Sequence, residues 1–471
     1  RDHSRSNPLP RRFGLLLIRT VLGIIYLIYS LFRRPDICFF SNTRLVRPTS
    51  TGSKQELKDV YLGDTTNAMR RRGWRVTVVG KYGRGASLER LRARGFFFPS
   101  DVIYLLVTIG RTIGLYRRSA RKWQRRWQTA QPTLSSHLRY QGCDIAPLVL
   151  PLVAANFQQH AIDIEVMVHI WQRILSLWRP KVIYINNSYG PAGMTANIAA
   201  KTLDIPTIEQ QHGVIGKNHL AYLVPRELKT GTNFPLCDTM TLWGPHTKRF
   251  LTEANVYPPD QLAVCGSPRI DRMLKKQQRN NDVREKLGIE AEAPLALYTS
   301  NAFARAFIVP ILDSIAHSQT RSDIHWIVKL HPSEKTRSIW QQEIAKRSLS
   351  NVIIIKDEFE FHPLLRACDV HITFASTTLI ESAVLGKLNL GLTTPNTPDP
   401  AGYQEAGAFL PVAPQALGPT VTTLLRNPAR RDRIRASQQS FADDWCLHDG
   451  HAVDRIVAHI ESITSSQKED S

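Results

Sequence analysis

The sequence predicts an α/β protein built on two parallel, doubly wound sheets. Short apolar runs alternate with helical patterns in two separate blocks, as they do where helices connect the strands of a parallel sheet. A polar stretch without a strand pattern, residues 272–293, lies between the blocks. A chain of 471 residues is also too long for a single core. We therefore expect two domains.

The elements follow in order along the chain. Strands are expected in the first block at 36–40, 75–79, 182–185, 206–209, 239–243 and 262–264, with helices near 64–72, 101–128, 162–178 and 192–203. Strands are expected in the second block at 295–298, 324–330, 352–355, 370–374 and 388–392, with helices at 308–318, 377–385, 413–425 and 450–464. This order predicts an N-terminal segment 1–35, a domain 36–275 with a basic helical region 84–145, a linker 276–293, a domain 294–440, and a final helix and tail 441–471 that packs back on the N-terminal domain.

The excess positive charge of the chain lies entirely in its first third. Residues 1–140 hold 28 Lys and Arg against 7 Asp and Glu, which accounts for the whole formal net charge of +21. Such a field attracts a polyanion, either nucleic acid or an anionic membrane leaflet. Because zinc-finger spacing, an RNP-like aromatic motif and a basic zipper are all missing, we expect a membrane surface and no nucleic acid.

An apolar segment at 13–32 supports the membrane interpretation. It is 20 residues long with Arg19 as its one charge, and arginine pairs flank both ends. Its length permits a membrane span, but an arginine in a bilayer core is costly. We expect a helix that lies in or dips into the interface; a true span and a helix packed within the protein are the alternatives.

A second basic segment lies at 101–128, which reads as one helix. Cations between Arg117 and Arg126 recur at i, i+4 spacing on one face, and Trp123 and Trp127 share a neighbouring face. Cations beside tryptophans suit a lipid headgroup layer. The alternative is a solvated helix whose tryptophans pack on the domain.

Four short motifs each follow directly after an expected strand, where open α/β sheets bind ligands. They are Gln211-His212-Gly213, Gly266-Ser267-Pro268-Arg269-Ile270-Asp271, Lys329-Leu330-His331-Pro332 and Ser376-Thr377-Thr378-Leu379-Ile380-Glu381. The six cysteines show no pairs at metal-ligand spacing, so we expect buried reduced thiols. No Asp-x-Asp motif stands at a strand end, which favours a transfer without a metal ion.

The motifs of the second block are typical of a site for a nucleotide-activated donor. Ser376, Thr377 and Thr378 combine hydroxyls with free amides at a helix N-terminus, which suits a phosphate; a plain N-cap with Glu381 is the alternative. Glu381 is also placed to accept ribose hydroxyls. His331, beside Lys329, can donate a hydrogen bond to the departing phosphate.

The motifs of the first block suit an acceptor. His212 can take a proton from an acceptor hydroxyl, in a loop that Gln211, Gly213 and Lys217 help to form. The alternative role of His212 is that of a hydrogen-bonded loop residue. Arg269 either bridges to the donor phosphate or forms a salt bridge with Asp271 that sets the hinge.

The ordered segments QHGVIGK, GSPRID, KLHP and STTLIESAVLGK resemble the GT-B superfamily. The similar branch holds CDP-glycerol glycerophosphotransferases, capsule Kdo transferases and bacterial sialyl- and polysialyltransferases. The match rests on His212-Gly213, on Gly266 with Pro268, Arg269 and Asp271, on His331-Pro332 and on Ser376-Thr377, and it covers about residues 160–460. The glycerophosphotransferase loop continues His-Gly-Thr-Pro, whereas this chain reads His212-Gly213-Val214-Ile215, which favours a sugar donor.

The resemblance implies a GT-B enzyme whose two Rossmann-like domains face each other across a cleft. The donor is expected to be CMP-, CDP- or UDP-linked and to occupy the C-terminal domain, with no resident cofactor and no metal. The acceptor is expected to be a cell-surface polysaccharide, such as a capsule, or a lipid-linked glycan. The predicted location is the cytoplasmic side of the inner membrane, peripheral or anchored by a single helix. The alternatives are a glycerophosphotransferase, a nucleotide-sugar epimerase, and a non-catalytic membrane or RNA-binding protein on the same fold.

Overall fold

The computed structural model describes most of the chain from residue 20 to residue 469. The residues between these limits that it does not describe are 22, 31, 42–46, 50–55, 81–96, 218, 224–234, 276–280, 301–303, 320–322, 332, 357, 375, 395–398 and 400. Parts of four predictions therefore lie outside the described residues: residues 13–19, 22 and 31 of the apolar segment, residues 84–96 of the basic region, residues 276–280 of the linker, and Pro332.

The chain forms two compact units. The first comprises residues 1–212, 227–241 and 455–471, and the second comprises residues 213–226 and 242–454. The final helix, α17 (Ala452–Glu469), thus contributes most of its length to the first unit. The change between units does not coincide with the linker that we predicted at 276–293, because the chain after β10 already packs with the C-terminal part.

The larger sheet is parallel and has the strand order β11-β10-β9-β8-β1-β4-β5. Its strands are β1 (Ile37–Ser41), β4 (Val76–Gly80), β5 (Phe97–Pro99), β8 (Val182–Ile185), β9 (Thr207–Gln210), β10 (Thr239–Leu242) and β11 (Leu262–Val264). The helices of this region are α2 (Gly63–Arg71), α4 (Asp101–Thr112), α5 (Arg117–His137), α6 (Ala146–Trp178), α7 (Pro191–Lys201), α8 (Pro245–Glu253) and α9 (Pro268–Lys275). Two short antiparallel pairs, β2 (Arg47–Thr49) with β3 (Glu56–Lys58) and β6 (Arg139–Tyr140) with β7 (Cys143–Asp144), complete it.

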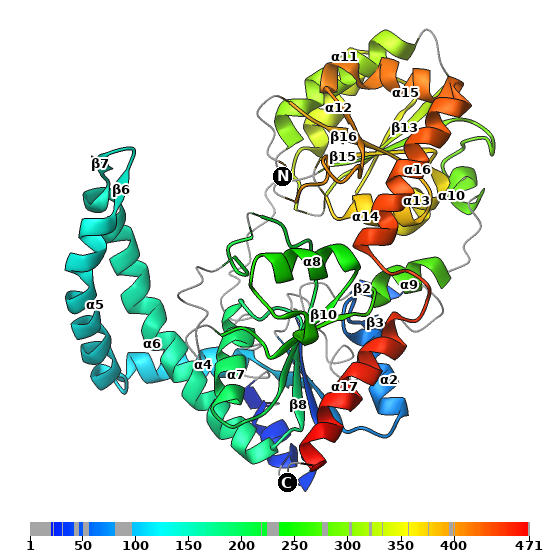
Figure 1. Cartoon of the computed structure of the whole chain (residues 1–471). Helices are drawn as coiled ribbons and strands as arrows, with labels where there is room; N and C mark the ends of the chain where they lie inside the picture. Colours follow the sequence, from blue (N-terminus) through cyan, green and yellow to red (C-terminus); the bar gives the residue numbers. More distant parts are fainter. Residues whose placement is uncertain are drawn as a thin grey trace, which may run out of the picture. The chain divides into compact units, whose positions relative to one another are not determined.

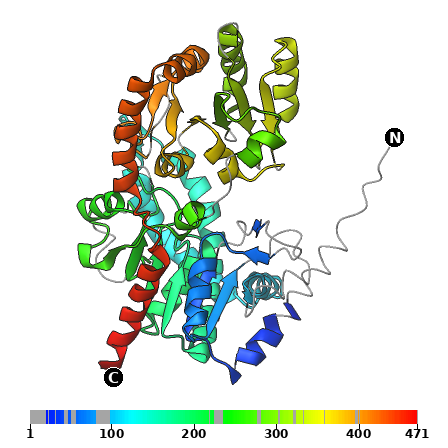
Figure 2. The same cartoon turned by 90° about the vertical axis from the view of Figure 1, so that its right-hand side faces the viewer.

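The second sheet is also parallel, with the order β14-β13-β12-β15-β16-β17. Its strands are β12 (Leu295–Thr299), β13 (His325–Lys329), β14 (Val352–Ile355), β15 (Val370–Thr373), β16 (Leu388–Leu392) and β17 (Leu410–Val412). Its helices are α10 (Asn281–Lys286), α11 (Ile308–Gln319), α12 (Arg337–Lys346), α13 (Phe361–Ala367), α14 (Thr378–Val384), α15 (Leu417–Arg426) and α16 (Pro428–Trp445). Figure 1 labels most of these elements, and Figure 2 turns the view by 90°. The predicted α/β class with parallel sheets is confirmed.

A separate apolar core explains where the second unit begins. Trp243, at the end of β10, packs in one cluster with Ile270 of α9, Leu379 of α14 and Trp445 of α16. Burial of large side chains of this kind contributes about 1.5–3 kcal/mol each. The cluster therefore ties the segment after β10 to the C-terminal helices, although its sequence belongs to the first block.

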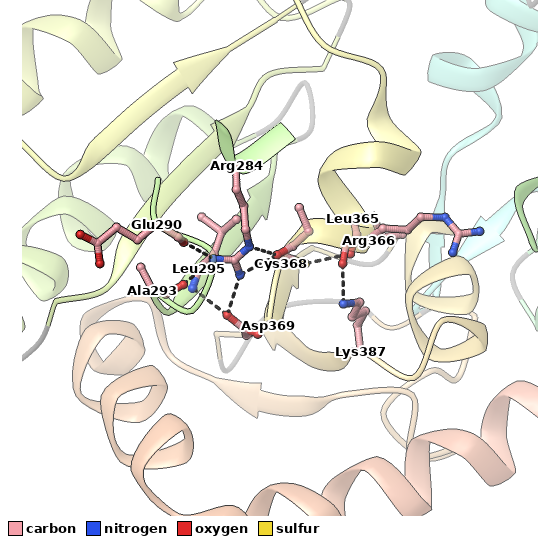
Figure 3. A network of polar contacts seen from close by, with 10 residues as sticks. Arg284, Glu290, Ala293, Leu295, Leu365, Arg366, Cys368, Asp369 and Lys387 are labelled. Carbon is pink, nitrogen blue, oxygen red and sulfur yellow. Dashed lines mark hydrogen bonds and ion pairs between the residues drawn. The ribbon is translucent and has the colours of Figure 1, made fainter. Parts of the chain in front are cut away.

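A buried arginine links α10 to the chain segments at the amino ends of β12 and β15 (Figure 3). Arg284 of α10 donates to the carbonyls of Ala367, Glu290 and Ala293 and pairs with Asp369, while Asp369 also accepts the amide of Leu295 at the start of β12. A charged hydrogen-bonded group that is removed from such a network leaves its buried partners unsatisfied. This network stabilises the fold, and none of its members lies at the ligand-binding edge of the sheet.

The predicted single helix at 101–128 is wrong, because it consists of α4 and α5. The break falls at Gly114, whose φ of +74° is a left-handed conformation that favours glycine. Figure 1 shows α5 running beside α6, with β6 and β7 at one end of the pair. Trp127 is buried and packs on Phe157 of α6, and the indole N–H of Trp123 donates to Glu165. The tryptophans thus pack on the protein, as the alternative interpretation stated.

Within the apolar segment, residues 20, 21, 23–30 and 32 are helical, and one face of this helix packs on the N-terminal core. Trp178 donates to Ser30 across a distance of 2.7 Å, and the ring of Tyr26 meets those of Phe98 and Trp178. A side chain at Gly23 would collide with Val102 of α4. The opposite face stays exposed. Within the described residues, no helix is both long enough and apolar enough to cross a bilayer.

Candidate functional site

The sequence motifs of the second block meet at one edge of the second sheet. Strands β13 and β15 flank β12 in parallel, and the register places Thr299 opposite both Lys329 and Thr373. The residues that follow these strand ends are therefore neighbours at the carboxyl edge, where such sheets bind ligands. His331 follows β13 and Ser376 follows β15, as the spacing of the motifs predicted.

The ring of His331 is held in one tautomer. Its Nδ1 accepts the backbone N–H of Ser333 at 3.2 Å and also contacts the Ser333 hydroxyl at 2.7 Å. Because a backbone amide can only donate, the proton of the neutral ring lies on Nε2. His331 is exposed, and among the described residues nothing hydrogen-bonds to Nε2. The side chain is thus arranged to donate a hydrogen bond to a ligand.

Ser300 is a residue of this edge that the sequence motifs did not identify. Its Oγ accepts the backbone N–H of His331 at 3.1 Å and donates to the buried carboxylate of Glu334. Ser300 follows β12 directly, so the strand-end rule that selected His331 also applies to it. Its hydrogen bond with the His331 N–H links the chain after β12 to the chain after β13, and it thereby fixes the position of the His331 backbone.

The hydroxyls that precede α14 are arranged for an anion. Ser376 Oγ accepts the amide of Thr378 at 3.3 Å, which leaves its own proton available to a ligand. Thr378 Oγ1 is shielded from solvent and has no hydrogen-bond partner among the described residues. Thr377 occupies the N-cap position without a side-chain cap, so the predicted plain N-cap is not formed by its hydroxyl. The role of these hydroxyls in phosphate binding stays a prediction.

Glu381 does not face solvent. Its side chain is 1% exposed, and its carboxylate pairs with Arg269 and, at 2.8 Å, with His362 Nε2. The carboxylate that we expected to accept ribose hydroxyls is therefore engaged by two side chains of the protein. Arg269 does not form the alternative salt bridge with Asp271. Instead, Asp271 accepts the amides of Gly450 and Ala452 and so fixes the start of α17.

A fully buried polar chain lies beneath this edge. His371 of β15 contacts Thr299 Oγ1 at 2.9 Å through Nε2 and Asn389 Oδ1 at 3.0 Å through Nδ1. Gln438 of α16 bonds both the N–H and the C=O of Asn389. Burial lowers the pKa of His371 to about 4. The imidazole is therefore neutral at pH 7, and it links three neighbouring strands.

His212, in the first unit, is coupled to residues that the motifs missed. Tyr189 Oη lies 3.0 Å from His212 Nε2, and the ring of Tyr61 meets the imidazole edge-on. Nδ1 of His212 is shielded from solvent. Burial raises the pKa of Tyr189, with Glu209 and Tyr61 adding to the effect, so the phenol is protonated at neutral pH. Tyr189 follows β8, where the strand-end rule again applies.

The predicted acceptor loop is divided between the two units after His212. Gln211 is buried and its backbone amide donates to Thr241 O. Gly213 and Lys217 belong to the second unit, and a Cβ at Gly213 would meet nothing within 4 Å. Glycine is therefore not required there by the protein's own packing. Lys217 lies at the wall of a cavity described below.

Solved structures of similar fold place the chain in a class. A UDP-GlcNAc 2-epimerase from Neisseria meningitidis bound to UDP-GlcNAc has a TM-score of 0.56 at 14% identity, covering 90% of this chain and 99% of that chain. A glycosyltransferase from Rickettsia africae has a TM-score of 0.53 at 11% sequence identity, covering 93% of this chain and 100% of that chain. Anabaena HepE in complex with UDP and glucose has a TM-score of 0.50 at 14% sequence identity, covering 92% of this chain and 100% of that chain. At these identities the likeness shows the fold.

The family follows from the sequence. The family model described as CDP-glycerol:poly(glycerophosphate) glycerophosphotransferase matches residues 207–462, and the chain belongs to this family. No curated protein matches the chain. The resemblance to the GT-B branch that holds the CDP-glycerol glycerophosphotransferases is thus confirmed, and so is the prediction of a glycosyltransferase-type enzyme.

Proposed function

We propose that this protein is a membrane-associated GT-B glycosyltransferase that moves a sugar from a nucleotide-activated donor to a glycan acceptor. The observation that carries the proposal is the edge of the second sheet, where the Nε2–H of His331 and the hydroxyls of Ser376 and Thr378 follow the two strands that flank β12. Donors of this kind at a strand edge suit the phosphates of a nucleotide. The acceptor is a cell-surface polysaccharide or a lipid-linked glycan.

In the proposed reaction, an acceptor hydroxyl attacks the anomeric carbon of the donor sugar. A new C–O bond forms, and the bond from the sugar to the donor phosphate breaks. The negative charge that develops on the leaving phosphate is stabilised by the Nε2–H of His331 and by the Ser376 hydroxyl. These groups need no change of protonation state, so the nucleotide leaves as the anion.

Tyr189 is the proposed path for the acceptor proton. Tyr189 covers Nε2 of His212, and Nδ1 is shielded, so an acceptor does not reach the imidazole directly. The Tyr189 side chain is 39% exposed. The acceptor hydroxyl passes its proton to the Tyr189 oxygen while Tyr189 passes its own proton to His212 Nε2. The phenol stays neutral in this exchange, as its raised pKa requires.

A glycerophosphotransferase is the second candidate, favoured by the family match over 207–462. The two candidates differ in which bond of the donor breaks. Incubating the purified protein with CDP-glycerol and with a panel of CMP-, CDP- and UDP-sugars, and measuring released nucleotide, separates them. Release of CMP from CDP-glycerol in an acceptor-dependent manner supports the glycerophosphotransferase. Acceptor-dependent turnover of a nucleotide sugar alone supports the glycosyltransferase.

Membrane association is proposed from an exposed apolar face in the first unit. The helix at 20–32 leaves Val21, Ile24, Ile25 and Ile28 exposed, and it packs against the N-terminal end of α4. Leu106 and Ile109 on α4 and Ile113 at its C-cap continue at helical spacing and are exposed, Ile113 by 65%. We define these seven residues as the apolar face. Exposed Arg33 and Arg34 follow the first of these helices, and exposed Arg117 and Arg118 begin α5, the next helix after α4. Aliphatic side chains rimmed by arginines suit an anionic leaflet.

Point variants test this face better than removal of residues 1–35, because Tyr26 and Ser30 belong to the N-terminal core. The full chain is expected to sediment with phosphatidylglycerol vesicles and to stay bound in high salt. The pair Ile109→Glu and Ile113→Glu should release it, whereas Val309→Glu, at an exposed position on α11, should not. Equal retention of all three proteins on the vesicles contradicts the assignment of this face.

A further inference from the structure

A cavity of about 510 Å³ lies within the second unit and involves neither His331 nor the hydroxyls before α14. Its walls come from the loop that holds Lys217, from α8, from the segment 401–406 and from the C-terminal half of α16. The volume falls in the range of small-ligand sites. Four separate chain segments thus line one open cavity.

The floor of the cavity is an aromatic stack. The ring of His246 lies parallel to that of Trp445, with centroids 4.0 Å apart and an interplanar angle of 15°. Behind the cavity wall, the buried ring of Tyr403 stacks on Trp445 at 5.1 Å. Burial lowers the pKa of His246, so the imidazole is neutral at pH 7. The nearby carboxylate of Asp444 is held by two hydrogen bonds from Arg249, one of them at 2.8 Å. The floor therefore presents the neutral ring of His246, backed by Trp445, and beside it the carboxylate of Asp444, whose charge is balanced by Arg249.

The rim of the cavity is polar and carries both signs of charge. Lys217 and Glu405 supply a cation and an anion, and Ser437 and Ser440 supply hydroxyls from successive positions of one face of α16. A diphosphate needs a concentration of cations or of free amides, which this rim lacks among its described residues. A neutral ligand that presents hydroxyls at its edge and C–H groups on its faces fits both the rim and the floor.

We infer that this cavity binds a saccharide unit of the acceptor glycan. The inference rests on the proposed function, and it assigns the acceptor to a place separate from the donor edge. Lys217, which the sequence placed in the acceptor loop, is a wall of the cavity. The hydroxyls of the glycan bond to Ser437, Ser440 and Glu405, and a sugar ring lies toward the His246–Trp445 stack.

The test fills the cavity from an exposed position. Ser440→Trp places a large side chain at the cavity wall, and Ala436→Trp is the matched control, because Ala436 is exposed on the same helix and does not line the cavity. Binding is measured by saturation-transfer-difference NMR with maltose, lactose and chitobiose as probes. The wild-type protein and the Ala436 variant are expected to give signals with at least one disaccharide. The Ser440 variant should lose most of that signal.

Two results overturn the inference. One is that no disaccharide gives a signal with the wild-type protein. The other is that the Ser440 variant gives the same signal as the control. Calorimetric titration of CMP, CDP, UDP and GDP into the same three proteins separates failure of the cavity assignment from failure of the proposed function. Saccharide binding without binding of any nucleotide keeps the cavity assignment and refutes the transferase proposal, whereas nucleotide affinity lost with Ser440→Trp assigns the cavity to the donor.

Discussion

The buried histidine beneath the carboxyl edge of the second sheet should make the stability of the protein depend on pH. His371 is completely buried between Thr299 and Asn389, and burial lowers its pKa from 6.5 to about 4. In the unfolded chain the same imidazole titrates near 6.5. Between these two values the unfolded state binds more protons than the folded state. The free energy of unfolding therefore rises with pH across this window, and the stability is lost as pH falls through it.

The size of the effect follows from the two pKa values. One unit of pKa difference corresponds to about 1.36 kcal/mol, so the full window contributes about 3 kcal/mol. Lowering the pH from 7 to 5 should remove about 2 kcal/mol of it, because at pH 5 the unfolded histidine is already largely protonated. Urea unfolding followed by circular dichroism at pH 7, 6 and 5 measures this loss.

His371→Gln should flatten the pH dependence, because glutamine can bond to Thr299 and Asn389 but does not titrate. His317→Gln is the control, since His317 is exposed on α11 of the same unit. The His371 variant is expected to be less stable at pH 7 but to lose less between pH 7 and 5. If both variants lose as much stability as the wild-type protein over that range, the buried neutral histidine is not the cause.

Three further outcomes are expected. His331→Ala should lower turnover by roughly 10²–10³-fold, the usual scale for one lost donor to a developing charge, and leave the unfolding midpoint in urea unchanged; near wild-type turnover contradicts its role. Tyr189→Phe should lower kcat by roughly 10²-fold or more, with little change in donor KM, and an unaltered kcat means that the acceptor proton takes another path. Arg284→Met should destabilise the protein by about 3 kcal/mol or more, because Asp369 and several carbonyls lose their buried partner; a urea midpoint equal to that of Arg337→Met, an exposed ion-pair variant, refutes this.

Much of the fold could be predicted because its strands are buried on both faces. Runs such as Val182–Ile185 and Val352–Ile355 are continuous β-branched and apolar stretches, and both strands have the predicted bounds. Helix α16 was missed because its buried side chains are few and its sequence is rich in arginine. The break between α4 and α5 was missed because one glycine in a helical pattern does not reveal its φ.

The candidate site could be predicted only where a motif directly follows a strand that the sequence pattern locates. His331 and Ser376 follow strands that the pattern locates, so their shared edge was predicted. The pairing of Glu381 with Arg269 and His362 was not, because it joins residues from three helices through burial that no local pattern encodes. Tyr189 was missed for a related reason: its role depends on its contact with His212, which is more than twenty residues away.

The central claim is that the edge after β13 and β15 binds the phosphates of a nucleotide-linked donor. Calorimetric titration of CMP, CDP, UDP and GDP into the wild-type protein and into the double variant Ser376→Ala with Thr378→Ala tests it most directly. Thr423→Ala, at an exposed position of α15, is the control. One nucleotide is expected to bind the wild-type and control proteins with one site per chain. The double variant should bind it at least roughly tenfold more weakly, since a hydrogen bond to a charged group contributes about 1.5–3 kcal/mol. The claim is contradicted if no nucleotide binds, or if the double variant binds as tightly as the control.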